Sequence, residues 1–339
     1  MKKSIWLAML SATLLPGCTT LEQTVEQLNA PYRYGYIDHT GSMAIAPRYK
    51  SAGSFSEQRA RVKLNSQWGF IDTGGRMVIE TRFQDAEDFS DKRARVRLDE
   101  TWGYVDETGA LVIPTRFGNA RDFSGGLARV EIHGSWGYVD VNGNTVIEAK
   151  FENARDFSDN RARIELDGLW GYIDKTGKIT IEPAFAKARD FHEGRARVLI
   201  EEHWGYIDES GKVVIEPRFT SARDFSEGRA RVQLDDQWGF VDSKGRIAIE
   251  ARFTQAGNFS EGLAKVKVGE AWGYVDKTGA VIITPRFTRA KDFSEGLARV
   301  KVGNDWGYID ATGNMVIDAR FARARDVCDG RAKVKLNTL

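Results

Sequence analysis

The sequence WGFIDTGG at residues 68–75 recurs along this chain at a constant interval of 34 residues. Its Trp-Gly pair returns seven more times, and Tyr34-Gly35 begins a further copy with tyrosine in place of tryptophan. Nine units therefore account for residues 34–339. A fixed period of this length is typical of proteins whose units pack on their neighbours and form one elongated or ring-shaped body. The tryptophans of the repeat are Trp68, Trp102, Trp136, Trp170, Trp204, Trp238, Trp272 and Trp306.

The unit that begins at Trp204 shows which secondary structure the repeat favours. Residues 204–208 (WGYID) alternate between two faces, as the side chains of a strand do. An Asp-x-x-Gly turn follows at residues 208–211, and residues 212–215 (KVVI) predict the second strand of a hairpin. Residues 229–234 (RARVQL) alternate strictly, with Ala, Val and Leu inward, which predicts a half-buried strand. Each unit therefore predicts three or four short antiparallel strands.

The content of the unit excludes a helical repeat, although the tetratricopeptide repeat has the same period. Apolar residues recur at every second position, and no long stretch has the 3.6-residue pattern of an amphipathic helix. We therefore predict an all-β chain of nine tandem antiparallel repeats.

Such repeats can form an open superhelical array or a closed nine-bladed ring of the β-propeller type. The array begins on a Tyr-Gly strand and ends on an Ala-x-Val-x-Leu strand, which is the phase that a ring needs if its two ends share one blade. Propellers typically have four to eight blades, however. The polar row on the Ala-x-Val-x-Leu strand also fits poorly with burial on both faces. We therefore favour the open array over the ring.

The Trp-Gly pair suggests how neighbouring units contact each other. A glycine inside a strand often marks a close approach by another group, and here it leaves a flat spot opposite the tryptophan. We expect the indole of one unit to lie in the glycine hollow of the next, so that the tryptophans form the structural core of the array. Replacing Trp204 by alanine is then expected to open a costly cavity.

Together these residues resemble the bacterial WG repeat: Trp-Gly-Tyr-Ile-Asp-x-x-Gly, then an aromatic residue, then Ala-x-x-Phe-Ser-x-Gly-x-Ala-x-Val. The first unit departs from this pattern at Tyr34, and the last departs at Val327-Cys328, where other units have Phe-Ser or, once, Phe191-His192. The resemblance implies a β-rich, non-catalytic repeat that is often found in envelope or secreted bacterial proteins and has no common substrate.

Residues 1–17 have the features of a secretory signal: two lysines, an apolar run and then small residues. The apolar run is too short to span a bilayer as a helix, which takes roughly 20 residues. Leu15-Pro16-Gly17-Cys18 resembles the bacterial lipobox, which implies that Cys18 is acylated and anchors the protein in a membrane. In such lipoproteins of Gram-negative bacteria, Thr19 in place of aspartate implies the outer membrane, and we expect the periplasmic side. Residues 18–33 then form a polar tether.

Charge balance and residue counts argue against several classes of function. The chain has 49 Lys and Arg against 48 Asp and Glu, which argues against nucleic acid or an anionic membrane surface as the main partner. Two cysteines exclude a disulfide framework. The histidines fall at different positions of the repeat, so stacking does not bring them together as a metal site or catalytic base requires. We therefore expect no catalytic residue, metal or cofactor. The histidines are His39, His133, His192 and His203.

Two repeated rows of side chains are candidates for binding. An outward arginine row on the Ala-x-Val-x-Leu strand is represented by Arg163, Arg197 and Arg231. It is either a binding row or an Arg–Asp ladder on a solvated face, and in both cases replacing it should barely change stability. An aromatic row that includes Tyr172 and Tyr206 either stacks on sugars or packs in the core.

The sequence thus favours a non-catalytic envelope lipoprotein that presents its repeat surface to a protein partner. Glycan or peptidoglycan binding is the alternative. Exposed tyrosine rows would favour the glycan, whereas buried ones would favour a protein.

Overall fold

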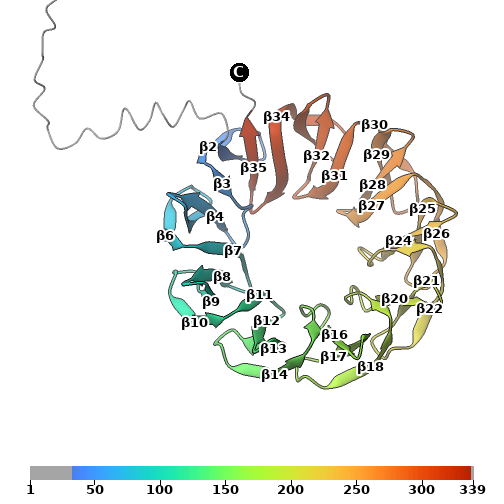
Figure 1. Cartoon of the computed structure of the whole chain (residues 1–339). Coiled ribbons are helices and arrows are strands. Elements are labelled where there is room, and N and C mark those ends of the chain that lie inside the picture. The colour runs from blue at the N-terminus through green and yellow to red at the C-terminus, as the bar shows by residue number, and fades with distance from the viewer. Residues whose placement is uncertain (1–32, 337–339) are drawn as a thin grey trace, which may run out of the picture.

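The computed structural model describes residues 33–336, which form strands and turns without a helix. The strands make nine four-stranded antiparallel blades in a ring, and the first strands of the chain lie beside the last ones (Figure 1). The prediction of an all-β chain of nine antiparallel repeats is confirmed. The predicted signal segment, Cys18 and nearly all of the tether lie outside the described residues. Within the described range, no helix is long and apolar enough to cross a membrane.

Each repeat contributes to two neighbouring blades. Its Trp-Gly hairpin supplies the third and outer strands of one blade, and its remainder supplies the inner two strands of the next. The inner strands are β3 (Ser51–Ala52), β7 (Asp85–Ser90), β11 (Asn119–Ser124), β15 (Asn153–Ala154), β19 (Lys187–Ala188), β23 (Ser221–Ala222), β27 (Gln255–Ser260) and β31 (Arg289–Ser294). The second strands are β4 (Arg59–Leu64), β8 (Arg93–Leu98), β12 (Leu127–Ile132), β16 (Ala162–Leu166), β20 (Ala196–Ile200), β24 (Arg229–Leu234), β28 (Leu263–Val268), β32 (Leu297–Val302) and β35 (Arg331–Leu336).

The Trp-Gly hairpins lie further from the axis of the ring. Their first strands are β1 (Tyr34–Ile37), β5 (Gln67–Asp72), β9 (Thr101–Val105), β13 (Ser135–Asp140), β17 (Leu169–Ile173), β21 (His203–Ile207), β25 (Gln237–Asp242), β29 (Ala271–Asp276) and β33 (Asp305–Ile309). The outer strands are β2 (Met43–Tyr49), β6 (Met77–Phe83), β10 (Leu111–Phe117), β14 (Thr145–Phe151), β18 (Ile179–Phe185), β22 (Val213–Phe219), β26 (Ile247–Phe253) and β30 (Val281–Phe287).

Pairing between the two ends of the described chain closes the ring. β34 (Met315–Cys328) is both the outer strand of the eighth blade and the inner strand of the ninth, which β35, β1 and β2 complete. In the antiparallel β1–β35 ladder, the Cα partners run from Tyr34–Lys335 to Ile37–Ala332. Of the two arrangements considered, the structure therefore adopts the closed ring and not the open array that we favoured.

The argument against closure failed because the polar row of the second strands is not solvated. Arg163 and Arg197 are only 8% and 9% exposed. A long side chain with an apolar stem can be buried when its charged end finds partners, and these arginines find them on the next blade. In the second strands of the blades, the alternation of apolar and polar residues therefore does not distinguish a buried face from a solvent-exposed one.

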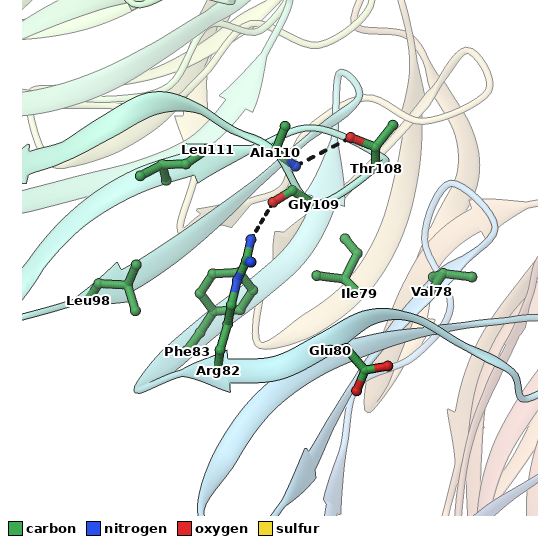
Figure 2. A pocket seen from close by; sticks show the side chains of 10 residues that line it. All are labelled: Val78, Ile79, Glu80, Arg82, Phe83, Leu98, Thr108, Gly109, Ala110 and Leu111. Atoms are coloured by element: carbon green, nitrogen blue, oxygen red, sulfur yellow. Dashed lines mark hydrogen bonds between the residues drawn. The ribbon is translucent and has the colours of Figure 1, made fainter.

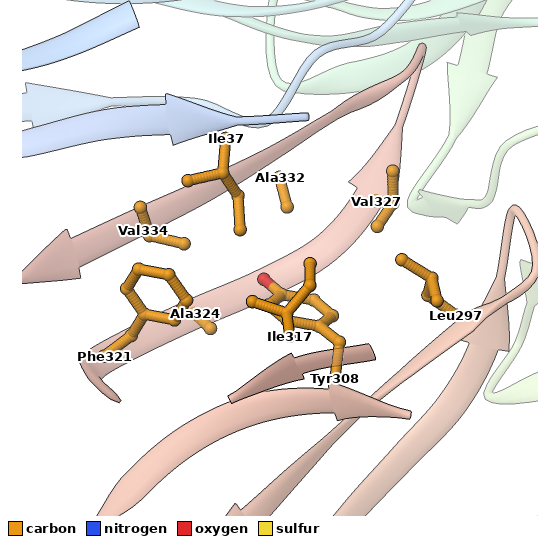
Figure 3. Packing of buried hydrophobic residues seen from close by; sticks show 9 residues of the cluster. All are labelled: Ile37, Leu297, Tyr308, Ile317, Phe321, Ala324, Val327, Ala332 and Val334. Atoms are coloured by element: carbon orange, nitrogen blue, oxygen red, sulfur yellow. The ribbon is translucent and has the colours of Figure 1, made fainter. Parts of the chain in front are cut away.

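Apolar clusters fill the spaces between blades. At the last boundary, Tyr308 and Phe321 of the eighth blade pack with Val334 and Ile37 of the ninth (Figure 3). T-shaped aromatic pairs bridge other boundaries, as where the rings of Tyr138 and Phe157 lie 5.0 Å apart. A fully buried side chain of this size stabilises the fold by about 1.5–3 kcal/mol, and it is buried only when both blades are present.

Polar contacts on the two sides of the ninth blade repeat those of internal boundaries. Arg116 donates from Nη2 to the carbonyl of Gly143 at 2.9 Å, and Arg320 donates in the same way to Gly41 at 2.8 Å. Similarly, the Asp329 carboxylate accepts a hydrogen bond from the backbone N–H of Gln58 at 2.8 Å. The ninth blade, in which the two ends of the described chain pair and which is called the seam below, is therefore joined to its neighbours by these same kinds of hydrogen bond.

The glycine of the Trp-Gly pair has a different role from the one that we expected. A Cβ at Gly205 would lie 2.6 Å from the carbonyl oxygen of Ile215 and 2.9 Å from the nitrogen of Pro217. Both atoms belong to β22 of the same blade, where the register with β21 shifts at a bulge. The glycine thus admits the outer strand, and no neighbouring indole fills its site. Trp204 itself is half-buried and packs at the edge of a cluster whose fully buried rings are Tyr206 and Phe219.

Candidate functional site

The candidate binding row forms ties between blades. Arg163 Nε lies 2.7 Å from Asp190 Oδ1, and Arg197 Nε lies 2.8 Å from Asp224 Oδ1, with each aspartate on the next blade. The Arg–Asp ladder suggested by the sequence is thus present, although in a buried setting. Arg231 is half-buried and donates to the carbonyl of Ala256. Because their Nε and Nη1 donors are engaged, Arg163 and Arg197 offer a partner little free hydrogen-bonding capacity, whereas the buried Nε of Arg231 has no hydrogen-bond partner among the described residues.

The tryptophan rings contact the guanidinium groups of this arginine row. The guanidinium carbon of Arg163 lies 5.0 Å from the ring centroid of Trp170, and that of Arg95 lies 4.5 Å from the ring of Trp102. A cation over an aromatic face is stabilised by about 0.5–2 kcal/mol. The half-buried indole therefore helps to hold the arginine that ties two blades together.

The aromatic row belongs to the core. Tyr172 and Tyr206 are fully buried, and their hydroxyls donate to the carbonyls of Arg189 and Arg223 on the next blade at 2.7 and 2.6 Å. Burial raises the pKa of both phenols far above the usual value. Neither ring has a free face on which a sugar could stack.

The remaining polar side chains that we considered do not converge on one site. His39 lies 3.4 Å from Glu295, whereas His192 lies 3.9 Å from Asp224 in another part of the ring. Within residues 33–336, no group of three or more His, Cys, Asp or Glu side chains could hold a metal ion. Cys328 is half-buried at the seam, and this burial raises the pKa of its thiol.

The turn aspartates have a structural role. Asp106 Oδ1 accepts hydrogen bonds from the hydroxyl of Thr108 at 2.6 Å and from the backbone N–H of Ala110 at 3.1 Å. The hydrogen bond from Thr108 is the main reason why the pKa of Asp106 lies below its usual value. Its carboxylate oxygen is thus engaged within the turn itself.

A concave groove lies at the rim of the ring. It lies between the outer strands β6 and β10, has a volume of about 790 Å³, and is shown in Figure 2. Apolar side chains dominate its walls, notably Val78, Leu98 and Leu111, whereas Glu80 adds a carboxylate. Arg82 donates to the carbonyl of Gly109 across the blade boundary. Sequence patterns did not predict this groove, because its two walls come from different blades.

The family model for the WG containing repeat matches the chain nine times, over residues 34–68, 68–102, 102–135, 136–170, 170–202, 204–238, 238–270, 272–304 and 306–337. The chain belongs to the WG repeat family. This assignment covers the entire ring, so the resemblance inferred from the motif is confirmed. No curated protein matches the sequence.

Solved structures resemble the WG repeat ring at low sequence identity. A crystal structure of the eukaryotic initiation factor has a TM-score of 0.57 at 11% identity, covering 91% of this chain and all of that one. BamB from Moraxella catarrhalis has a TM-score of 0.41 at 12% identity, covering 89% and 87% of the two chains. Hsv2p from Kluyveromyces lactis has a TM-score of 0.40 at 9% identity, covering 66% and 91%. The first of these likenesses supports the fold and nothing more.

The buried arginines of the WG repeat ring predict a loss of stability on substitution. Replacing Arg197 by serine removes its charge-assisted hydrogen bonds to the next blade, and we expect the free energy of unfolding to fall by about 2 kcal/mol. The control is Arg76→Ser, whose side chain is 81% exposed in its pair with Asp72 and whose loss should cost at most about 0.5 kcal/mol. Denaturant unfolding measures both. If both variants lost the same small amount of unfolding free energy, Arg197 would lie on a solvated face, as one interpretation of the sequence suggested.

Proposed function

We propose that this WG repeat protein is a non-catalytic scaffold of the bacterial cell envelope that binds a protein partner at the rim of its ring. The groove between β6 and β10 carries the proposal, because apolar concave surfaces of this kind are common sites of recognition. An extended segment with apolar side chains is the occupant that fits best.

The edge of β6 supports an extended occupant. β6 is the outer strand of its sheet, so one of its edges is unpaired within that sheet. Proline blunts such an edge in β10, at Pro114, and in β22, at Pro217, whereas β6 contains none. A strand from a partner could therefore add to β6 and place alternate side chains in the groove.

The proposed location in the cell envelope rests on the N-terminal sequence. The lipobox-like Leu15-Pro16-Gly17-Cys18 supports acylation at Cys18, and Thr19 supports anchoring in the outer membrane on the periplasmic side. The glycan-binding alternative has less support, since the tyrosines that it needs are buried. No specific observation in the described residues favours it.

The groove is tested by crosslinking in cells of the source bacterium. A photo-crosslinking residue at position 111 of the full-length protein should capture one defined protein, whereas the same residue at position 169 should not. Leu111 and Leu169 are 40% and 39% exposed, so they are matched in accessibility. Leu111→Asp should then abolish co-purification of that protein, and Leu169→Asp should not. Identical crosslinking at the two positions would contradict a groove-specific partner.

The anchor is tested separately with Cys18→Ser. Because acylation needs the cysteine thiol, we expect this variant to lose incorporation of labelled fatty acid and to move from the membrane to the soluble envelope fraction. Binding through the groove should persist in the soluble variant. Unchanged membrane fractionation together with unchanged labelling would rule out the lipoprotein assignment.

A further inference from the structure

A hollow of about 190 Å³ lies beside the seam, between the eighth and ninth blades. One aromatic ring comes from each of these blades, Trp306 of β33 and Tyr34 of β1. Apart from Ala324, the other side chains that line the hollow are cationic: Arg299, Arg323, Arg325 and Lys333.

In the blade formed by β11 to β14, the equivalent cations are compensated. Arg129 Nε lies 3.2 Å from the carboxylate of Asp156. Arg121 donates to Asn119 Oδ1 at 2.7 Å, and its guanidinium carbon lies 5.6 Å from the ring centroid of Trp136. Each of these two positive charges thus has a carboxylate, an amide oxygen or an indole face as its partner.

At the seam, three sequence changes remove these partners. Arg323 stands where Asn119 stands in its repeat, so an acceptor is replaced by a second cation, which donates to the hydroxyl of Tyr34 at 3.3 Å. The smaller ring of Tyr34 replaces the tryptophan. Among the described residues, the guanidinium of Arg325 has no hydrogen bond, ion pair or ring contact, and both it and Arg323 are exposed.

Lys333 is the third cation without a carboxylate partner. It occupies the position of Arg129, but Ser54 stands where Asp156 would pair with it, and its ammonium donates instead to the carbonyl of Ala52. Its nitrogen lies 5.2 Å from the ring centroid of Tyr34.

Most of the charges around Lys333 are also positive and disfavour its protonated form. Burial lowers the pKa of Lys333 to about 8, aided by repulsion from Arg325 of β34 and Arg61 of β4, while Asp88 of β7 acts in the opposite direction. Of the cations around the hollow, Arg299 alone is neutralised within the described residues, by Asp326 at 2.6 Å.

We propose that this hollow binds an oxyanion of the phosphate or sulfate type. Arginine forks match the oxygen geometry of such groups and form their strongest hydrogen bonds with them. Since a water molecule takes up about 30 Å³ of liquid volume, the hollow has room for a tetrahedral oxyanion and part of the group that carries it. Trp306 and Tyr34 provide ring surfaces for a flat carrier. This site is independent of the groove at β6.

Calorimetric titration of the full-length protein with sodium sulfate and with phenyl phosphate tests the site. Both probes should bind, with phenyl phosphate tighter if the rings contact the carrier. Arg325→Gln should weaken binding about tenfold or more, since a charge-assisted hydrogen bond is lost. The matched control, Arg121→Gln at the equivalent position of another blade, should leave binding unchanged. Absence of binding, or equal effects of the two variants, would overturn the proposal.

Two further readouts separate a built site from general attraction to a basic surface. In buffer without oxyanions, Arg325→Gln should unfold at the same or a higher temperature than the natural protein, because it removes repulsion, whereas Arg121→Gln should unfold at a lower one. Sulfate does not titrate near neutral pH, so its affinity should be constant below pH 8 and should fall above it as Lys333 loses its proton. A lower unfolding temperature for Arg325→Gln, or a flat profile from about pH 7 to pH 10, would contradict the site.

Discussion

The antiparallel ladder between β1 and β35 is the constraint on which the other contacts in this molecule depend. A blade is a four-stranded sheet with apolar side chains on both faces, so it is covered only when it has a neighbour on each side. An open array would leave two such faces in water, and repeat proteins of that kind need polar terminal units for solubility. Closure removes both ends at once, and no capping unit is required.

Polar side chains set the spacing between blades, and aromatic side chains fill it. The Arg–Asp ties lie on the inner side of the ring, where each guanidinium rests on an indole and reaches an aspartate of the next blade. Tyrosine hydroxyls cross the same boundaries and donate to backbone carbonyls. Because the buried polar groups find partners only on the correct neighbour, they favour one blade register over others. Substitutions break this pattern at Arg231, where Asn258 replaces the aspartate, and at the seam, where they leave the cationic hollow.

Much of the fold could be predicted from the sequence because the local signals agree with one another. The period, the alternation in residues 229–234 and the Asp-x-x-Gly turns all indicate short antiparallel strands, and the structure has them. The closure of the blades into a ring could not be predicted from the sequence in the same way. The phase of the chain ends allowed it, but Arg163 and Arg197 look like solvent-facing residues until the carboxylates of the next blade are in place. The role of Gly205 was hidden for a similar reason, since the bulge that crowds it depends on how β21 and β22 pair.

The candidate site was less accessible to sequence reasoning than the fold. The groove at the rim combines Val78 and Leu98 with Leu111 across a blade boundary, and no local pattern marks that combination. By contrast, the departures at Tyr34 and Val327-Cys328 were visible in the sequence, but their meaning needed the pairing of the chain ends. Irregularities in a repeat protein thus became informative only after their positions in the ring were known.

Native-state amide hydrogen exchange across the seam tests the closed ring most directly. Exchange rates of the β1 and β35 amides should be compared with those of β4 and β5, which form the corresponding pair inside the ring. A closed ring predicts that the two ladders are protected to a similar degree, since both open only in a large cooperative unfolding event. Amides of β1 and β35 that exchange as fast as frayed chain ends, while those of β4 and β5 remain protected, would contradict it.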